Sequence, residues 1–85
     1  MSTTAPATVK YADATSLEKI AYDSVKSIPT KEPNDQSRLG YHIWLLLKEK
    51  KGSVADAVKH SGARILIPEK ETVSIIEAEL KKMSV

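Results

Sequence analysis

The stretch SRLGYHIWLLLKEKKGSVADAVKHSGARILIP, residues 37–68, decides the fold. It joins the strongest apolar pattern of the chain to two glycines, Gly52 and Gly62, at which helices are expected to end. Its apolar residues recur at intervals of three and four, which predicts one face of a helix. They are Leu39, Ile43, Leu46 and Leu47. We expect this helix to begin at Ser37, with Asp35 or Ser37 as its N-cap, to run to about Lys51 and to end at Gly52.

Three further apolar residues, Tyr41, Trp44 and Leu45, widen that face. The helix is therefore buried on two sides, or the segment GYHIWLLLK is a strand instead. The regular pattern continues into KEKK, and this length favours the helix. We expect Trp44 in the core, with base stacking as the alternative.

The remainder of the stretch predicts a second helix and an extended segment. SVADAVKHSG is typical of a short helix with Ser53 as N-cap and Gly62 directly after its end. The next residues, ARILIP, alternate and place Ile65 and Ile67 on one face, which predicts a short strand that Pro68 limits.

The flanks predict two more helices. TSLEKIAYDSVKSI, residues 15–28, has the capping pair Thr15 and Glu18, stops at Pro29 and leads into the polar loop PTKEPNDQ. PEKETVSIIEAELKKM, residues 68–83, fits one helix, although ETVSII could instead return as the second strand of a hairpin. Its inward-facing residues are expected to be Val73, Ile76, Leu80 and Met83.

The predicted fold class is mostly α: a small domain of three or four helices with a short strand or wing. Residues 1–13 are rich in Ser, Thr, Ala and Pro without an apolar period, which predicts a disordered tail before a single domain over residues 14–85. A chain of 85 residues can build only a thin core.

Composition narrows the class of protein. The chain has no cysteine, which excludes disulfides and thiolate sites and fits a reducing compartment. Its start, MSTTAPATVKYADATS, has no basic segment followed by an apolar one, and the longest apolar run, IWLLL, is far below the roughly 20 residues that span a bilayer. We expect a soluble protein of the cytoplasm, nucleoid or nucleus, with no membrane partner.

Charge is distributed unevenly along the chain. Residues 1–35 hold four bases and five acids, residues 36–70 hold seven bases and three acids, and residues 71–85 hold two bases and three acids. The three segments therefore carry −1, +4 and −1. A basic middle is typical of a surface that faces phosphates, or of a segment that lysines simply keep solvated.

The same stretch resembles the excisionase-like winged helix-turn-helix DNA-binding domains over residues 37–80. In that family a recognition helix containing W-L and ending in Gly precedes a wing ending in G-x-R-x-x-I-P and a last helix. Here SRLGYHIWLLLKEKKG, VKHSGARILIP and EKETVSIIEAEL follow in that order. The resemblance implies that the helix over residues 37–51 approaches the major groove, while the segment from Lys59 to Arg64 touches backbone or minor groove.

Two other resemblances use the same residues. GSVADAVKHSGA is similar to the first helix and turn of bacterial helix-turn-helix regulators, with Ala57 and Gly62 in the expected places. Pro68 then requires a longer turn before the second helix. SGARILIP resembles the start of the second strand of the KH domain, an RNA-binding fold, with EKKG where that fold has its G-x-x-G loop.

The candidate nucleic-acid contacts fall into two kinds. Lysines suit phosphate contacts, which need charge rather than exact geometry, and Arg38 and His42 lie one turn apart on the less apolar side of their helix, facing base edges or water. The predicted set is Arg38, His42, Lys48, Lys50, Lys51, Lys59, His60 and Arg64. We expect no catalytic residue, metal or cofactor, because no acid pair, nucleophile arrangement or ligand cluster stands out.

The predicted function is that of a small DNA-binding accessory or regulatory protein, not an enzyme. Its partners would be DNA, a larger protein and, if the wide apolar face of residues 39–47 is left uncovered, a second copy in a homodimer. Two alternatives remain: a protein-interaction adaptor or inhibitor that does not bind nucleic acid, and a KH-like RNA binder.

Overall fold

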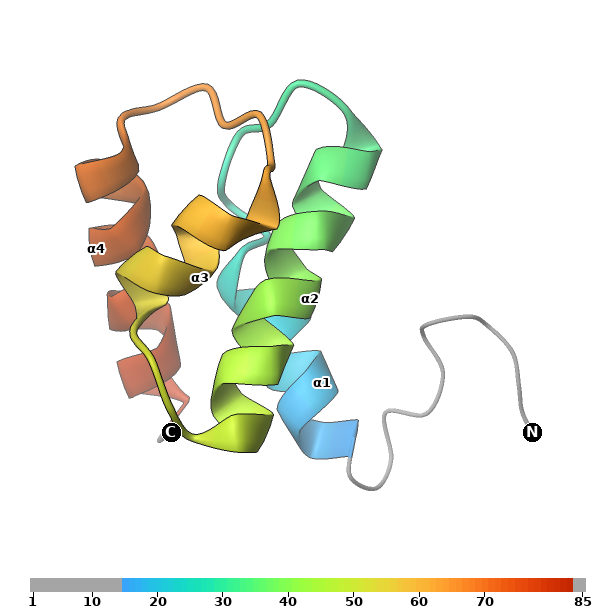
Figure 1. The fold of residues 1–85 in the computed structure, drawn as a ribbon, viewed down its shortest axis with the longest axis vertical. Coiled ribbons are helices and arrows are strands. Elements are labelled where there is room, and N and C mark those ends of the chain that lie inside the picture. Colours follow the sequence, from blue (N-terminus) through green and yellow to red (C-terminus); the bar gives the residue numbers. More distant parts are fainter. Residues whose placement is uncertain (1–14, 84–85) are drawn as a thin grey trace.

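Four helices make up residues 15–83, the part of the chain that the computed structural model describes (Figure 1). They are α1 (Thr15–Ser24), α2 (Pro33–Glu49), α3 (Val54–Ser61) and α4 (Glu69–Lys82). α2 packs between α1 and α3, and α4 contacts both α3 and α1, so the helices close around one core. The predicted small, mostly helical domain is confirmed, whereas the predicted tail over residues 1–13 lies outside the described residues.

The core is drawn from every helix and from the end of the turn after α1. Its buried apolar residues are Ala21, Val25, Ile28, Leu39, Ile43, Val54, Ala57, Val58, Ile76 and Leu80. Leu46 and Leu47 are half-buried and pack against this core, as do Val73 of α4 and Trp44. The wide apolar face predicted for the second helix is thus largely covered within the chain, and Tyr41 is its large exposed member.

α1 ends at Ser24, four residues before the predicted end of that helix. Val25 and Ile28 continue in tight turns, in which the Ile28 N–H donates to the Val25 carbonyl at 3.0 Å. The side chain of Gln36 donates to carbonyls of this turn, and these bonds replace the helical ones that would have extended α1. The predicted capping pair at the start depends on the side chain of Thr15, which lies outside the described residues.

α2 begins at Pro33, so the predicted start at Ser37 is wrong, as is the assignment of the whole segment before it to a loop. Proline is favoured at the first helical position, where its missing N–H needs no partner. Glu32 is the N-cap, and its backbone N–H donates to the Asp35 carboxylate at 3.0 Å. The helix ends at Glu49, and its C-cap Lys50 takes the left-handed conformation (φ 56°) and donates its N–H to the Leu46 carbonyl at 2.8 Å.

α3 confirms the predicted short helix and both of its caps. The Ser53 hydroxyl accepts a hydrogen bond from the Asp56 N–H at 3.1 Å, which satisfies a free donor of the first turn. Gly62 follows the helix with φ 69°, a conformation that glycine adopts without steric cost.

The segment after Gly62 is not a strand. It makes one isolated antiparallel bridge, Thr30 to Ile65, and residues 15–83 contain no strand, so the predicted wing is not confirmed. Figure 1 shows the two connections, α1 to α2 and α3 to α4, side by side. The predicted alternation does hold: Ile65 and Ile67 pack against the core, while Leu66 is 60% exposed.

α4 confirms the predicted last helix and excludes the alternative hairpin. Ile76 and Leu80 are buried, and Thr72 is buried with its hydroxyl donating to the Pro68 carbonyl at 3.0 Å. The KH-like alternative requires a β-sheet, and residues 15–83 form none. None of the helices in this part of the chain is both long enough and apolar enough to cross a bilayer.

Candidate nucleic-acid interface

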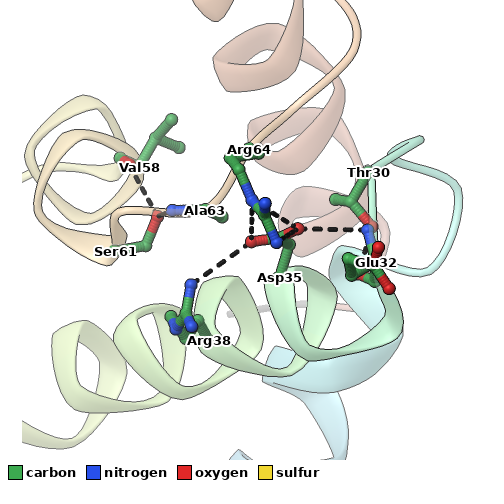
Figure 2. A network of polar contacts seen from close by, with 8 residues as sticks. All are labelled: Thr30, Glu32, Asp35, Arg38, Val58, Ser61, Ala63 and Arg64. Carbon is green, nitrogen blue, oxygen red and sulfur yellow. Dashed lines mark hydrogen bonds and ion pairs between the residues drawn. The ribbon is translucent and has the colours of Figure 1, made fainter.

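A buried carboxylate joins two of the predicted contact residues. Asp35 is fully buried, and Figure 2 shows its carboxylate between Arg64, Arg38 and the N–H of Glu32. Arg64 Nε lies 3.2 Å from both oxygens and its Nη2 lies 3.1 Å from Oδ2, while Arg38 Nη1 lies 3.2 Å from Oδ1. The sequence did not single out this role for the two arginines.

The charges around Asp35 determine its ionisation. Burial raises the pKa of the Asp35 carboxyl, but the hydrogen bonds from Arg64 and the backbone N–H of Glu32 outweigh burial and hold that pKa below its ordinary value. Asp35 is therefore ionised at neutral pH and anchors both guanidinium groups. Because Arg64 lies in the α3–α4 connection, this ion pair fixes that connection to the start of α2.

Short polar contacts hold the same region in place. The Ser61 hydroxyl donates to the Val58 carbonyl at 2.8 Å and accepts from the Ala63 N–H at 3.1 Å (Figure 2). The Lys31 N–H donates to the Arg64 carbonyl at 3.0 Å. Arg38 and Arg64 keep about half of their side chains exposed, 52% and 56%, so they can meet an anion only while they also serve Asp35.

An open groove of about 370 Å³ between α2 and α3 brings together three other predicted residues: His42, Lys51 and His60. Leu45, Leu46 and Ala57 contribute apolar surface to it. Glu49 and Asp56 line the same groove, so its charge is mixed and does not favour a polyanion along its whole length.

The end of α2 carries the most available positive charge among the predicted residues. Lys48, Lys50 and Lys51 are exposed, and none of them forms an ion pair with another residue of the described range 15–83. The carbonyl groups at the end of a helix give it a partial negative charge, which stabilises cations there. Lys48 Nζ also lies 4.6 Å from the centroid of the Trp44 ring, a cation–π contact.

The structure does not gather all eight predicted residues into one surface. Lys59 is exposed on α3 and lines a different hollow, with Gly62, Ile65 and Glu69, away from the groove that His42 and His60 share. The eight residues thus divide among the Asp35 ion pairs, the α2–α3 groove, the end of α2 and the side of α3 that faces the start of α4.

Trp44 lies at the edge of the core rather than inside it. It is half-buried, packs against the core and has Lys48 over its ring. Tyr41, which the sequence suggests only as a widening of the apolar face, is 45% exposed, with its ring centroid 5.8 Å from that of Trp44. The spacing of Tyr41, Trp44 and Lys48 by three and four residues was the signal that could have revealed this exposed stripe.

Within residues 15–83, no group of three or more His, Cys, Asp or Glu side chains is placed to share a metal ion. No family model, curated protein or solved structure matches the chain. The excisionase-like resemblance therefore stays a prediction from sequence motifs.

Proposed function

We propose that the protein binds DNA as a small accessory or regulatory module, and that its phosphate contacts are made by Lys48, Lys50 and Lys51. One observation carries the proposal: these three exposed lysines stand at the end of α2 without an acid partner in the described range 15–83. Phosphate contacts provide most of the non-specific affinity for DNA, and they need accessible charge.

Two other lysines, one in α1 and one in the turn after it, differ from these three because they have an acid partner. Lys19 Nζ lies 2.9 Å and Lys26 Nζ 3.1 Å from the carboxylate of Asp23. The hydrogen bond from Lys19, joined by the one from Lys26, lowers the pKa of the Asp23 carboxyl despite its partial burial. Binding of a phosphate by either lysine would compete with this contact, whereas the lysines at the end of α2 have no such contact to give up.

Arg38 and His42 remain the proposed residues for base edges, because they belong to the helix that the lysines terminate, with Arg38 exposed and His42 half-buried. Arg38 would have to read a base while it also holds Asp35, so its contribution to specificity cannot be separated from its part in the fold. A single module of this size makes few contacts, so useful affinity requires a larger protein partner or a second copy.

A salt titration of binding to random-sequence duplex DNA tests the proposal. The logarithm of the affinity should fall linearly with the logarithm of the salt concentration, and each change of Lys48, Lys50 or Lys51 to Ala should reduce that slope by about 0.9. Lys70→Ala is the matched control, because Lys70 is exposed and forms no ion pair in the described range. It belongs to the first turn of α4, and the start of α4 lies at the opposite end of the molecule from the end of α2 (Figure 1). Equal slopes for the control and the three variants would contradict the proposal.

The second candidate function is docking on a protein, which the exposure of Tyr41 and Leu66 favours. Apolar contacts of this kind respond weakly to salt, in contrast to phosphate contacts. If the biological activity survives the loss of the three lysines but not the change of Tyr41 or Leu66 to Ser in a folded variant, the protein is an adaptor rather than a DNA-binding module.

A further inference from the structure

The outer side of α2 carries a stripe that joins aromatic rings to free positive charge. Tyr41, Trp44 and Lys48 are spaced by three and four residues, so they follow one another along one side of the helix. The ring planes of Tyr41 and Trp44 are inclined at 44°, and the Tyr41 ring is also 5.6 Å from that of His42, edge to face. Tyr41 is 45% exposed, so part of its ring faces solvent.

We propose that this stripe binds single-stranded DNA, with an unpaired base stacked on Tyr41 and the neighbouring phosphates at Lys48, Lys50 and Lys51. The inference rests on the proposed function and narrows it from DNA in general to the single strand. Tyr41 and Lys48 are about 10 Å apart along the helix axis, at 1.5 Å per residue, so a strand that stacks on Tyr41 passes the lysines within a few nucleotides.

The exposed ring is the reason for choosing the single strand. In a duplex each base is already stacked between its neighbours, and a ring held on a helix surface cannot reach its face. Unpaired bases stack readily on aromatic side chains whatever their identity, and a basic track alongside holds the backbone. The stripe has both parts: Tyr41 supplies a partly exposed aromatic ring, and Lys48 supplies a charge that forms no ion pair with a described residue.

A second copy of the chain fits the stripe less well. In a symmetric contact centred on the end of α2, Lys48, Lys50 and Lys51 of the two copies would lie close together, and their like charges would repel. A standard interface also takes roughly 800 Å² from each partner, which a stripe with one half-exposed tyrosine does not offer. A flexible polyanion with flat bases complements both the charge and the rings.

Trp44, the single tryptophan of the chain, reports directly on the stripe. Its emission should be quenched when a single-stranded DNA of about twelve nucleotides is added, a length within the range of single-strand sites. The duplex of the same sequence should bind more weakly and quench less. Tyr41→Leu should weaken single-strand binding at least about fivefold and leave duplex binding unchanged. Tyr41→Phe, which keeps the ring, should retain single-strand binding.

Controls separate the inference from the function on which it rests. Leu66→Ala removes the other large exposed apolar side chain of residues 15–83, on the α3–α4 connection, and should change the affinity for neither single-stranded nor duplex DNA. Equal affinity for duplex and single strand, or an unaffected Tyr41→Leu variant with a wild-type circular dichroism spectrum, would overturn the inference and leave the proposed function standing. Loss of salt-dependent binding to both forms would overturn both. Tighter binding of the same sequence as RNA would overturn the choice of DNA.

Discussion

Gln36 offers a sharp test of how α2 holds the end of α1. Its side-chain Nε2 donates to the carbonyl oxygens of Val25, Lys26 and Ile28 at 3.0, 3.2 and 3.0 Å. Changing Gln36 to Glu keeps the shape of the side chain but places a carboxylate oxygen against three carbonyl oxygens. We expect this variant to be much less stable than the wild type at neutral pH.

The size of the effect follows from the donors that are lost. The amide nitrogen carries two protons, so its three contacts amount to about two full hydrogen bonds, each worth roughly 0.5–1.5 kcal/mol net. A negative charge near the start of α2 returns about 0.3–1 kcal/mol, while repulsion adds to the loss. We expect a net decrease of about 2 kcal/mol in the free energy of unfolding, and a decrease in Tm of roughly 8–16 °C. That is a large share of the roughly 4–13 kcal/mol that a chain of this length provides.

The loss of stability in the Gln36→Glu variant should depend on pH in a defined direction. The carboxylate form of Glu at position 36 is disfavoured in the folded state, which raises its pKa there above the unfolded value. The destabilisation is therefore complete above that raised pKa and fades as pH falls through it, because the protonated acid can donate again. Urea unfolding followed by circular dichroism should show the difference between wild type and variant shrinking between about pH 7 and pH 4.

Ser37→Glu is the matched control, since it adds the same charge one residue later at an exposed position. Its free energy of unfolding should stay within about 0.5 kcal/mol of the wild type. If the Gln36 and Ser37 variants are equally stable at neutral pH, or if the deficit of the Gln36 variant does not change with pH, then the Gln36 amide does not hold the end of α1.

Three further outcomes are expected from the same unfolding measurements. Because the pKa of the Asp35 carboxyl lies below its ordinary value, its contribution to stability is complete well above that ordinary value and is lost as pH falls through it toward the folded pKa. The free energy of unfolding should therefore drop as the pH falls below about 5, and should drop less in Asp35→Asn. A Gly to Ala change stabilises an ordinary helix by about 1 kcal/mol, but at Gly40 the new Cβ meets the Tyr22 ring, so Gly40→Ala should lose about 1 kcal/mol. In a Tyr22→Ala background the same change should no longer lower the free energy of unfolding. Ser53→Ala should cost about 1 kcal/mol through the lost cap, whereas Ser53→Asp should cost little.

Helix existence could be predicted from the sequence because its signals are local. Ser53 and Gly62 mark the two ends of α3, and both caps lie where the pattern places them. The start of α2 was missed for a local reason too: Pro33 resembles a loop residue, although proline is equally suited to the first position of a helix. Glu32 and Asp35, three residues apart, were the available sign of a cap before Ser37.

Pairing between distant segments could not be predicted in the same way. The alternation of Ile65, Leu66 and Ile67 correctly indicates which side chains face the core, because that depends on the local backbone alone. Whether an extended segment becomes a strand depends on its partner. Here the partner is Thr30, 35 positions away in a short connection that offers a single bridge, so no ladder forms.

The pairing of charges between distant residues could not be predicted from the sequence either, and this pairing bears on function. A sum over residues 36–70 counts charges by their position in the chain, whereas an approaching anion meets the charges that remain unpaired in space. Asp35 lies one residue before that segment, yet it is the acid that Arg38 and Arg64 share. The two arginines therefore serve the fold first, and the free positive charge on α2 lies at its C-terminal end. This placement favours contact of a polyanion with the end of α2 over docking of the whole helix in a groove, and it is why the lysine variants should change binding while Arg38→Ala should also change stability.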